Sequence, residues 1–528
     1  MAQNYDAVVI GGGHNGLTCA SYLAGAGLKT LVLEQYHIVG GMTVTEEITL
    51  PGFRSDIHAF GYQLANLSPV PRELGLEKFG FELLRPDPNF SHVFPDGGIV
   101  SMRRELEDTV RSIGRYSPKD AETWRKLFQN YLKVKDQIIS GVNSPPKSLG
   151  AELSALELLP GGLDEYRFGL QSTRSWCDEW FEADETKVFL ATFASHPGLA
   201  PDDAGGGRLA WLFNTILQDV GNKVVKGGMH NLSLALARYL ESQSGEIRAN
   251  APVRKIAVKE GKAVGIELAD GEEIAVSGVV ASSVDPHQLI VHFLGEEVVG
   301  PELVAKLDRY EWGDSALVIY LALDGPVEYN AGLVARHSAY VHPTPPTLDY
   351  FSQCYTECRG GKLPAAPLVI MCNDSVVDPS RTPPNKYVMK LIVNNVPYRI
   401  TGDATGKIGA RTWEQAKEPY ADHIIDMITD TYAHNFKNLI LKRVVHSPED
   451  MERIIPSAVR GTVAHGAFVP YQMGSMRPIP ELGNYRTPVP NVYLCGSGSH
   501  PGAGVSMAPG RNAARLILAD LRAGRKTL

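Results

Sequence analysis

The sequence has no long uninterrupted apolar run. The apolar stretch Ala7–Ile10 is followed at once by three glycines, and no other segment approaches the roughly 20 apolar residues that a membrane-spanning helix needs. The first residues also lack the basic head and apolar block of a secretory signal. We therefore expect a cytoplasmic protein that does not span a membrane.

Cysteine and positive charge are both scarce. The six cysteines in 528 residues are too scattered for a disulfide framework. Cys354 and Cys358 are the one close pair, and without a matching Cys or His pair they are weak evidence for zinc, so we predict no metal site. A net charge of −8 argues against nucleic-acid binding. The basic tail at 522–526 could touch an anionic membrane surface, although a solvated helix end is the alternative.

A glycine-rich turn stands near the start of the chain. An apolar run at 6–10 predicts a strand, and a run rich in Ala and Leu at 17–26 predicts a helix. Between them, Gly11, Gly13 and Gly16 occupy the three positions of the G-x-G-x-x-G fingerprint. In that fingerprint the glycines allow a tight turn, a close approach to pyrophosphate and close helix–strand packing.

The residues after this turn strengthen the prediction of a dinucleotide site. A second predicted strand at 29–33 ends at Glu34, close to the position where an acidic residue binds ribose hydroxyls. A carboxylate there disfavours the 2′-phosphate of NADP. Gly40 and Gly41 follow, and they fit either a second ligand loop or a bare turn. These residues alone do not decide between NAD and FAD.

The far end of the chain repeats the arrangement of strand, glycine-rich turn and helix. A predicted strand at 491–495 leads into the turn at 496–505 and then into a helix at about 506–522. A helix N-terminus after such a turn favours anionic groups, because its free N–H groups and positive dipole end point at them.

Both ends resemble one family. The residues that carry the resemblance are Gly12–Gly16, Val39–Gly41 with Thr45–Glu47, Gly461–Gly466, and the run 496–505, which is similar to G-x-G-x-H-P-G-x-G-V. They are similar to the phytoene desaturase-like FAD oxidoreductases, and most similar to the branch of pyridine nucleotide-disulfide oxidoreductase domain-containing proteins. Many relatives carry Arg, Ala or Ser in place of Met42, so the side-chain role of Met42 does not transfer.

The resemblance implies an α/β fold with one FAD. Its Rossmann-type FAD-binding domain would be discontinuous, at 1–90, 225–300 and 480–528, and an inserted α+β substrate domain would span 91–224 and 301–479. Residues expected to bind FAD are Gly11, Gly13, His14, Asn15, Gly16, Glu34, Gly40, Gly41, Met42, Thr43, Val253, Gly496, Pro501, Gly504 and Val505. Val253 would flank the adenine, and the 496–505 turn would lie beside the isoalloxazine ring.

Two histidines are the candidates for acid–base catalysis. His465 precedes the last predicted strand and His500 lies in the second glycine-rich turn, and histidine is the side chain that titrates near neutral pH without a large shift. Tyr471 and Arg477 follow as further candidates. For each of the four, a hydrogen-bonded structural role is the alternative.

The predicted reaction is dehydrogenation or desaturation of an apolar small molecule. The sequence has no second G-x-G-x-x-G unit for NAD(P)H, and Gly402–Lys407 fits an exposed turn better than a phosphate loop. Oxygen or a quinone is then the expected electron acceptor. C–N oxidation of an amine and a non-catalytic FAD-stabilised binding protein are the alternatives. A homo-oligomer is a further option. The aromatic side chains of Trp176, Trp180, Phe181 and Phe189 fit either the lining of an apolar tunnel or plain core.

Overall fold

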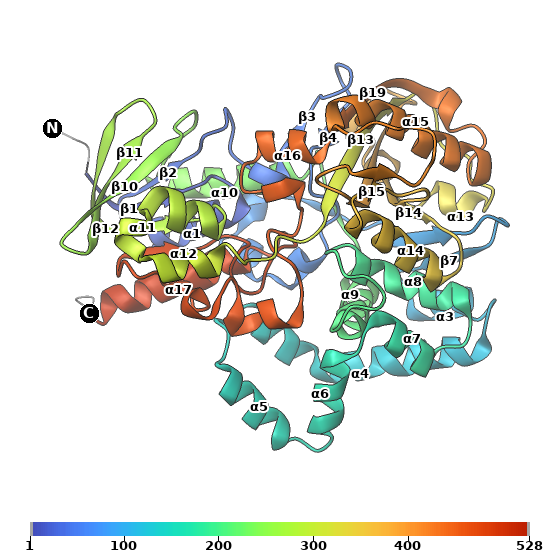
Figure 1. Cartoon of the computed structure of the whole chain (residues 1–528), viewed down its shortest axis with the longest axis horizontal. Coiled ribbons are helices and arrows are strands. Elements are labelled where there is room, and N and C mark those ends of the chain that lie inside the picture. Colours follow the sequence, from blue (N-terminus) through green and yellow to red (C-terminus); the bar gives the residue numbers. More distant parts are fainter. Residues whose placement is uncertain (1–3, 525–528) are drawn as a thin grey trace.

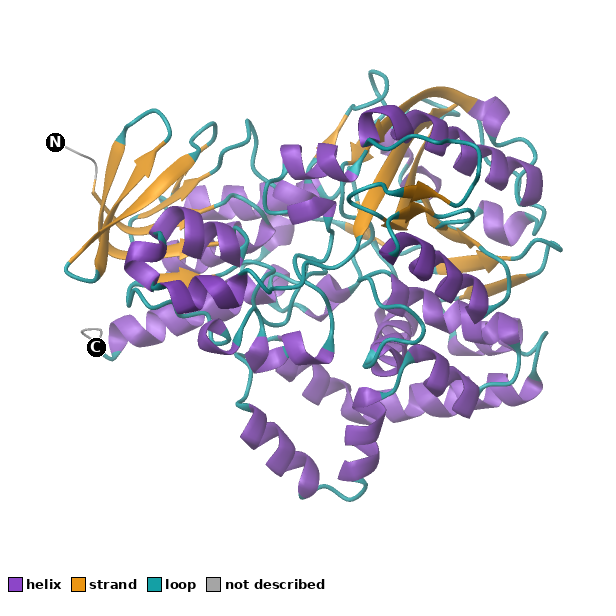
Figure 2. Cartoon of the chain, viewed as in Figure 1, coloured by secondary structure: helices purple, strands orange, loops and turns teal. Residues whose placement is uncertain are grey.

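A computed structural model describes residues 4–524, so the last residues of the basic tail lie outside the described part. Two seven-stranded sheets dominate the molecule. They lie at opposite ends of its long axis, and a layer of helices runs below the second sheet (Figures 1 and 2). Both the first and the last described residues lie at the end that holds the first sheet.

The first sheet combines a parallel core with an antiparallel meander. Its order is β10-β11-β12-β1-β2-β9, with β20 paired to β12. Strands β1, β2, β9 and β20 run parallel to β12, and the start of β12 also pairs antiparallel with β11. The bounds are β1 (Asn4–Ile10), β2 (Thr30–Leu33), β9 (Glu246–Arg248), β10 (Val253–Lys259), β11 (Lys262–Leu268), β12 (Glu273–Ser282) and β20 (Val492–Leu494).

Alternating side chains of β1 give the first sheet two buried faces. Ala7 and Val9 pack under α1 (His14–Gly25), α10 (His230–Ser242) and α17 (Ala508–Arg522). Val8 and Ile10 pack with Leu289 and with α12 (Pro301–Leu307) on the other face. Parallel strands covered by helices on both faces are characteristic of α/β folds. The predicted Rossmann-type α/β class is confirmed.

The second sheet is mixed and mainly antiparallel, in the order β19-β13-β17-β16-β14-β6-β7. One face carries Leu317, Ile319 and Leu321, which pack against α15 (Trp413–Thr431). The opposite face of β13 carries Val318, which packs against Ile57 from the N-terminal part of the chain. The bounds are β6 (Phe90–Val93), β7 (Ile99–Met102), β13 (Ser315–Leu323), β14 (Tyr340–Pro343), β16 (Leu368–Cys372), β17 (Tyr387–Val396) and β19 (Ile440–His446).

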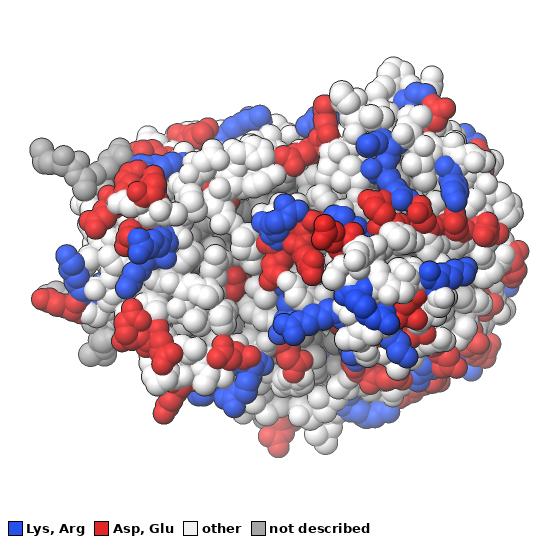
Figure 3. Space-filling view, turned by 45° about the horizontal axis from the view of Figure 1, so that its top comes forward, with Lys and Arg blue, Asp and Glu red and all other residues white. Residues whose placement is uncertain are grey.

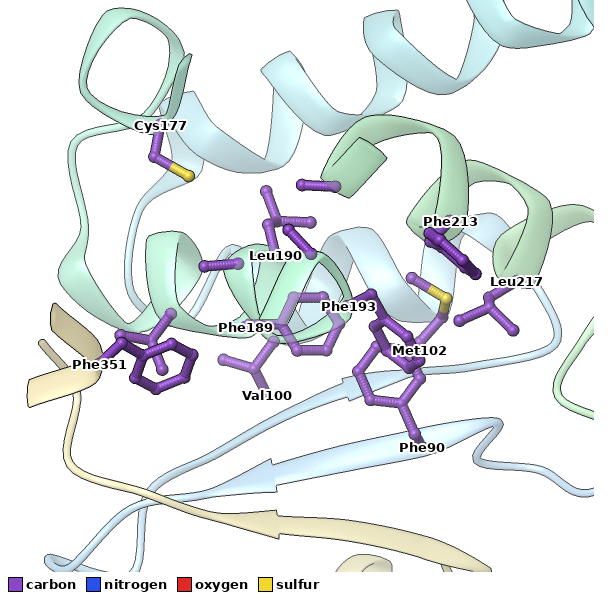
Figure 4. Packing of buried hydrophobic residues seen from close by; sticks show 14 of the residues in the cluster. Phe90, Val100, Met102, Cys177, Phe189, Leu190, Phe193, Phe213, Leu217 and Phe351 are labelled. Atoms are coloured by element: carbon purple, nitrogen blue, oxygen red, sulfur yellow. The ribbon is translucent and has the colours of Figure 1, made fainter. Parts of the chain in front are cut away.

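A helical layer covers the edge of the second sheet. Phe90 of β6 stacks on Phe189 at 4.9 Å and meets Phe193 edge-on at 4.5 Å (Figure 4). The helices of this layer are α3 (Leu106–Ile113), α4 (Pro118–Val142), α7 (Thr173–Trp180), α8 (Asp184–Ser195), α9 (Gly206–Val220) and α14 (Leu348–Arg359).

A helical hairpin projects from this layer (Figures 1 and 2). It consists of α5 (Leu149–Glu157) and α6 (Gly162–Leu170), and several of its large apolar side chains face solvent. Leu158 is 86% exposed and Leu163 81% exposed. Within residues 4–524 no helix combines the length and apolarity that a membrane crossing needs.

The predicted elements are present, with shifted boundaries. Helix α1 begins at His14, three residues before the expected start, because the helix follows Gly13 directly. Helix α17 begins at Ala508 instead of 506, because Met507 has a left-handed backbone. The segment after Gly402 is a turn closed by the Asp403 carboxylate, as expected. All six cysteines are buried free thiols.

Candidate functional site

A cavity of about 1030 Å³ lies at the carboxyl ends of the parallel strands. Ile10 pairs with both Leu33 and Ser282, and Ser282 pairs with Leu494, so the four strand ends are level. Ligands of open α/β sheets bind in the crevice outside these ends. We call this space the strand-end cavity. The turns after the strands supply much of its wall, namely Gly11, Gly13, Glu34, Gln35, Tyr36, Ser283, Val284 and Ser497.

Three glycines shape the turn between β1 and α1. A Cβ on Gly16 would lie 2.0 Å from the Gly11 carbonyl oxygen, so only glycine allows the helix this close to the strand end. Gly11 has φ +92°, and a Cβ there would lie 2.5 Å from Ser283 Oγ. A Cβ on Gly13 would meet nothing nearer than 4.0 Å, and Gly13 lines the strand-end cavity. A side chain at Gly13 would therefore occupy ligand space.

Glu34 stands at the wall of the same cavity. Its Oε2 accepts the Gly12 N–H at 2.7 Å and its Oε1 accepts the Tyr36 N–H at 2.8 Å. Burial raises the pKa of Glu34, and these backbone donors oppose the rise. Each carboxylate oxygen keeps a further lone pair, so Glu34 can still accept a hydrogen bond from a ligand hydroxyl.

The segment at 40–43 packs against the glycine turn. Gly40 donates its N–H to the Gly12 carbonyl at 2.8 Å, and Thr43 Oγ1 donates to the Gly40 carbonyl at 2.7 Å. Gly41 and Met42 line the cavity, whereas Gly40 and Thr43 lie behind its wall. Of these four expected contacts, two are placed to touch a ligand and two hold the wall in position.

A second cavity, of about 930 Å³, is mainly apolar. We call it the apolar cavity. Its apolar lining residues are Ala59, Phe60, Pro197, Phe213, Ile392, Val463, Ala464, Phe468, Ala503 and Val505. It shares five lining residues with the strand-end cavity, namely His14, Met42, His58, His465 and Ser497. We call these five residues the junction, because the two cavities meet there.

The turn before α17 borders the apolar cavity with a strained backbone. Gly504 has φ +112° and lines the cavity. Val505, which also lines it, has φ +56°, and Met507 has φ +59°. A β-branched residue at positive φ is a genuine outlier, and such strain is concentrated at functional sites.

His465 is the one of the two expected catalytic histidines that reaches the junction. Its Nδ1 lies 2.9 Å from the Ser457 carbonyl oxygen, which can only accept, so Nδ1 carries the proton. Nε2 of the neutral ring is then unprotonated. Burial lowers the pKa of His465 to about 4, and the Arg477 charge contributes to the decrease.

Arg477 holds the His465 segment in place. It is fully buried, and its guanidinium donates to carbonyl oxygens of Ala464, His465, Gly466, Ala467 and Ser497. No carboxylate in the described part of the chain pairs with it. Burial lowers its pKa. Arg477 is therefore a buried cation whose partners are carbonyl dipoles beside the junction.

His500, Gly496 and Pro501 lie behind the cavities. His500 Nε2 is 3.1 Å from the Gly141 carbonyl oxygen, and the ring lines neither cavity. A Cβ on Gly496 would lie 2.3 Å from the Ser283 carbonyl oxygen, so this glycine allows two turns to pack closely. Tyr471, the further candidate, is 62% exposed and donates to Glu311.

The four aromatic residues considered for a tunnel do not form one. Trp176, Phe181 and Phe189 are buried in the core of the helical layer, and Trp180 is 42% exposed. The tunnel interpretation was wrong, and plain core is correct for the three buried residues. The aromatic residues that do line the apolar cavity are Phe60, Phe213 and Phe468.

Comparison with known proteins shows the family. The sequence pattern of the flavin-containing amine oxidoreductases matches residues 16–427, which is most of the chain. The chain belongs to this family. This protein is therefore an FAD-dependent oxidoreductase.

Two relatives and one solved structure show the range of this similarity. The flavoprotein is 32% identical to mouse (Mus musculus) pyridine nucleotide-disulfide oxidoreductase domain-containing protein 2, over 99% of this chain and 94% of the relative. It is 30% identical to a limonene dehydrogenase component of Castellaniella defragrans, over 98% and 95%. Cyclohexylamine oxidase from Brevibacterium oxydans shares the fold, with a TM-score of 0.60 at 15% identity over 98% and 99%. The resemblance drawn from the sequence is confirmed.

The strand-end cavity of this flavoprotein fits a dinucleotide. Asn15 Oδ1 and His14 Nε2 are buried and have no hydrogen-bond partner in the described structure, although both residues line the cavity. Glu34, directly after β2, and Val253, the first residue of β10, line it as well. Orphaned polar atoms beside the glycine turn are what a ligand with many hydrogen-bonding groups would satisfy.

Several cavity residues were not foreseen. His58, His196, Phe60 and Phe468 lie in loops without a recognisable motif, and Ile392 belongs to a strand whose apolar pattern looks like any other core strand. One signal was local: Phe468 lies two residues after the Gly461–Gly466 segment that carries the family resemblance. The others come together through tertiary contacts alone.

Proposed function

We propose that this flavoprotein dehydrogenates an apolar organic molecule bound in the apolar cavity. The observation that carries the proposal is the junction, where the strand-end cavity and the apolar cavity share His14, Met42, His58, His465 and Ser497. A dinucleotide with its ring system at the junction would present that ring to a molecule in the apolar cavity. Bound FAD supplies the hydride acceptor.

The chain's own residues have three tasks in this reaction. The apolar walls exclude water and align the substrate, which lowers the entropy cost of reaching a reactive geometry. His465 Nε2 accepts a proton from the carbon next to the one that loses hydride. The pKa of about 4 keeps His465 neutral at physiological pH, so the base is available but weak.

An apolar substrate is favoured over a charged amine. The lining of the apolar cavity includes no Asp or Glu, so an ammonium group placed there would lack a counter-charge. The relative named as a limonene dehydrogenase component supports an uncharged terpene-like substrate. C–N oxidation remains the second candidate, because the family is named for amine oxidoreductases.

We propose that the projecting α5–α6 hairpin contacts a membrane surface. Leu149, Leu153, Leu158, Leu159 and Leu163 are each at least 40% exposed. The hairpin also carries four acidic residues and one arginine at 149–170, which disfavours both an anionic bilayer and a second copy of the same hairpin. A zwitterionic bilayer is the partner that fits. On the face shown in Figure 3, acidic and basic side chains are interspersed.

Anaerobic reduction of the bound FAD tests the proposed reaction. We expect an uncharged terpene to bleach the flavin absorbance, and NADH and a primary amine to bleach it slowly or not at all. Oxygen or a quinone should restore the colour. Bleaching by the amine alone would replace the proposal with C–N oxidation, and rapid stoichiometric bleaching by NADH would contradict the proposed electron route.

A further inference from the structure

A small polar pocket adjoins the apolar cavity. It spans about 210 Å³, part of which is open to solvent, and shares five lining residues with that cavity, namely His196, Pro197, Asn394, Val463 and Ala464. Its remaining lining residues are Ser195, Gly198, Asp314, Ser315 and Asn395. The apolar cavity therefore has one end where polar side chains gather.

Three separate elements bring these side chains together. His196 follows the end of α8, Asp314 precedes the start of β13, and Asn394 and Asn395 lie near the end of β17. Residues 392 and 394 of β17 point to the same face of the sheet, so Ile392 and Asn394 both line the apolar cavity. The pocket is thus fixed by the scaffold of the second sheet and not by a mobile loop alone.

Two buried atoms of the pocket have no hydrogen-bond partner in the described structure. They are Nε2 of His196 and Oδ1 of Asn395. Asn395 is 1% exposed, and its Nδ2 donates to Asp314 Oδ2 at 3.2 Å. A buried polar atom without a partner carries a desolvation cost, so such atoms usually mark a bound water or a ligand group.

We propose that the polar pocket binds a hydroxyl group of the substrate. This inference rests on the proposed function and narrows its substrate class to an apolar molecule with an alcohol at one end. A hydroxyl both donates and accepts, so it can donate to Asn395 Oδ1 and accept from His196. An ether or ketone oxygen accepts only and would leave Asn395 Oδ1 unsatisfied.

The charges around the pocket favour an alcohol over an ammonium group. Asp314 is the acidic residue of the pocket, and the positive charge of Arg359 lies close enough to affect it. Arg359 itself pairs with Asp203 at 2.6 Å and donates toward the Gly198 carbonyl. Burial raises the pKa of Asp314 to about 6, and the charge that remains at neutral pH is offset by Arg359 and by the Asn395 amide donor.

Binding of three matched ligands to the oxidised holoenzyme tests the inference. The probes are 1-octanol, 1-methoxyoctane and octylamine, and the readout is the change in flavin absorbance during titration. We expect 1-octanol to bind about tenfold more tightly than 1-methoxyoctane, because the ether cannot donate a hydrogen bond. Octylamine should bind more weakly than 1-octanol.

His196→Phe is the informative variant. The ring of His196 packs against Phe193 at 4.7 Å and Phe60 at 5.5 Å, and phenylalanine preserves this packing while removing Nε2. We expect the preference for 1-octanol over the ether to disappear and FAD content to stay unchanged. Ser195→Ala is the matched control, because Ser195 lines the same pocket but its hydroxyl already donates to the Ala191 carbonyl.

The outcomes separate the inference from the proposed function. Equal binding of 1-octanol and the ether, or an unchanged preference in His196→Phe, overturns the hydroxyl site and leaves the apolar cavity intact. A preference for octylamine that disappears in Asp314→Asn assigns the pocket to an ammonium group and overturns the inference. Failure of all three probes to bind contradicts the apolar substrate site itself.

Discussion

At the scale of single residues, His465 combines an unusual backbone with a defined tautomer. Its φ is +51°, a region in which histidine and asparagine are enriched relative to other side chains. The Ser457 carbonyl fixes the proton on Nδ1, and Arg477 donates to the His465 carbonyl at 3.3 Å. The ring is therefore oriented by Ser457 and the backbone of His465 is held by Arg477, with Nε2 unprotonated at the junction.

His465→Asn should retain FAD and lose about 10²–10⁴-fold in the rate of flavin reduction, the range typical of general-base catalysis. Asparagine tolerates the left-handed backbone and its amide can replace Nδ1 as donor to Ser457, but it offers no base. In the wild type the rate should be constant from about pH 5.5 to 8, because the base is protonated only as the pH falls through about 4. Stopped-flow reduction across this range measures both effects.

His500 provides the comparison for this prediction. It lines neither cavity, and its ring is already engaged with the Gly141 carbonyl, so His500→Asn should reduce the rate by less than about threefold. A large loss in the His500 variant with a normal His465 variant would reverse the assignment. An acid limb with a midpoint near 6.5 in the wild type would contradict the lowered pKa of His465.

The residues that could be predicted from sequence are those whose role depends on near neighbours. Gly11, Gly13 and Glu34 follow a local pattern of strand, turn and helix, and that pattern is itself the structure of the turn. His196 and Asn395 are almost 200 residues apart, and no local pattern relates them. Which of two similar histidines reached the site depended on tertiary packing as well.

At the scale of elements, the turn before α17 concentrates strain at the wall of the apolar cavity. Four residues in a row of six have positive φ: Gly502, Gly504, Val505 and Met507. The neighbouring structure imposes this conformation, since Val505 would not adopt it in isolation. A Cβ on Gly504 would lie 2.8 Å from Leu64 Cδ1, so the turn is also tightly packed.

Gly504→Val should weaken FAD binding by at least about tenfold, because strain of roughly 1–3 kcal/mol would displace the turn. The flavin that remains should have a lower reduction potential, because the anionic reduced form loses nearby backbone dipoles. Gly271→Val is the control: Gly271 has φ +90° and an added Cβ meets nothing within 4 Å. The FAD dissociation constant and the flavin reduction potential are measured in both variants. Equal effects in the two would mean that backbone strain in general, and not the place of Gly504 beside the site, is responsible.

The α5–α6 hairpin should carry the affinity for zwitterionic vesicles. Replacing Leu158, Leu159 and Leu163 with Ser removes exposed apolar area without touching the core, so flotation with phosphatidylcholine vesicles should fall several-fold while FAD content stays constant. Leu333→Ser is a control, since Leu333 is 64% exposed outside the hairpin. Unchanged flotation would contradict the membrane proposal, and a change of mass in light scattering would instead indicate self-association.

Element boundaries show where sequence patterns stop being informative. The second predicted strand, at 29–33, is found as β2 (Thr30–Leu33), because its apolar run coincides with its pairing to β1. Helix α1 includes His14 and Asn15, which look like turn residues in the sequence but are helical because Gly13 ends the turn. The projection of α5–α6 away from the body has no counterpart in the pattern, because exposure depends on what the rest of the chain covers.

At the scale of the whole molecule, a buried ionic cluster connects the N-terminal part of the chain with the second sheet. Arg381 is 1% exposed and pairs with Asp56 at 2.9 Å and with Asp374 at 3.1 Å. Lys390, on the second sheet, donates to the carbonyl oxygens of Asp56 and His58. Because His58 belongs to the junction, the second sheet helps to position the site that the first sheet begins.

Buried histidines should make the whole molecule sensitive to acid. Burial lowers the pKa of His14, His92 and His196 to about 3 and that of His465 to about 4. The unfolded chain protonates these rings below about 6.5, whereas the folded chain does not do so until pH 3–4. The unfolded state therefore binds more protons in this window, and stability falls as the pH falls from about 6.5 to 4.

The size of this effect can be measured and assigned. Each such histidine contributes about 1.4 kcal/mol per pH unit, and Asp285 and Asp314, whose pKa values burial raises to about 6, act in the opposite direction. Burial also lowers the pKa values of His58 and His342, so the buried histidines together leave a net loss of stability on acidification. We expect a clearly lower thermal midpoint at pH 5 than at pH 7, at fixed FAD concentration and scan rate. His196→Phe should make the difference between the two thermal midpoints smaller, because it removes one ring that takes up a proton on unfolding. Equal midpoints at both pH values would contradict the lowered histidine pKa values.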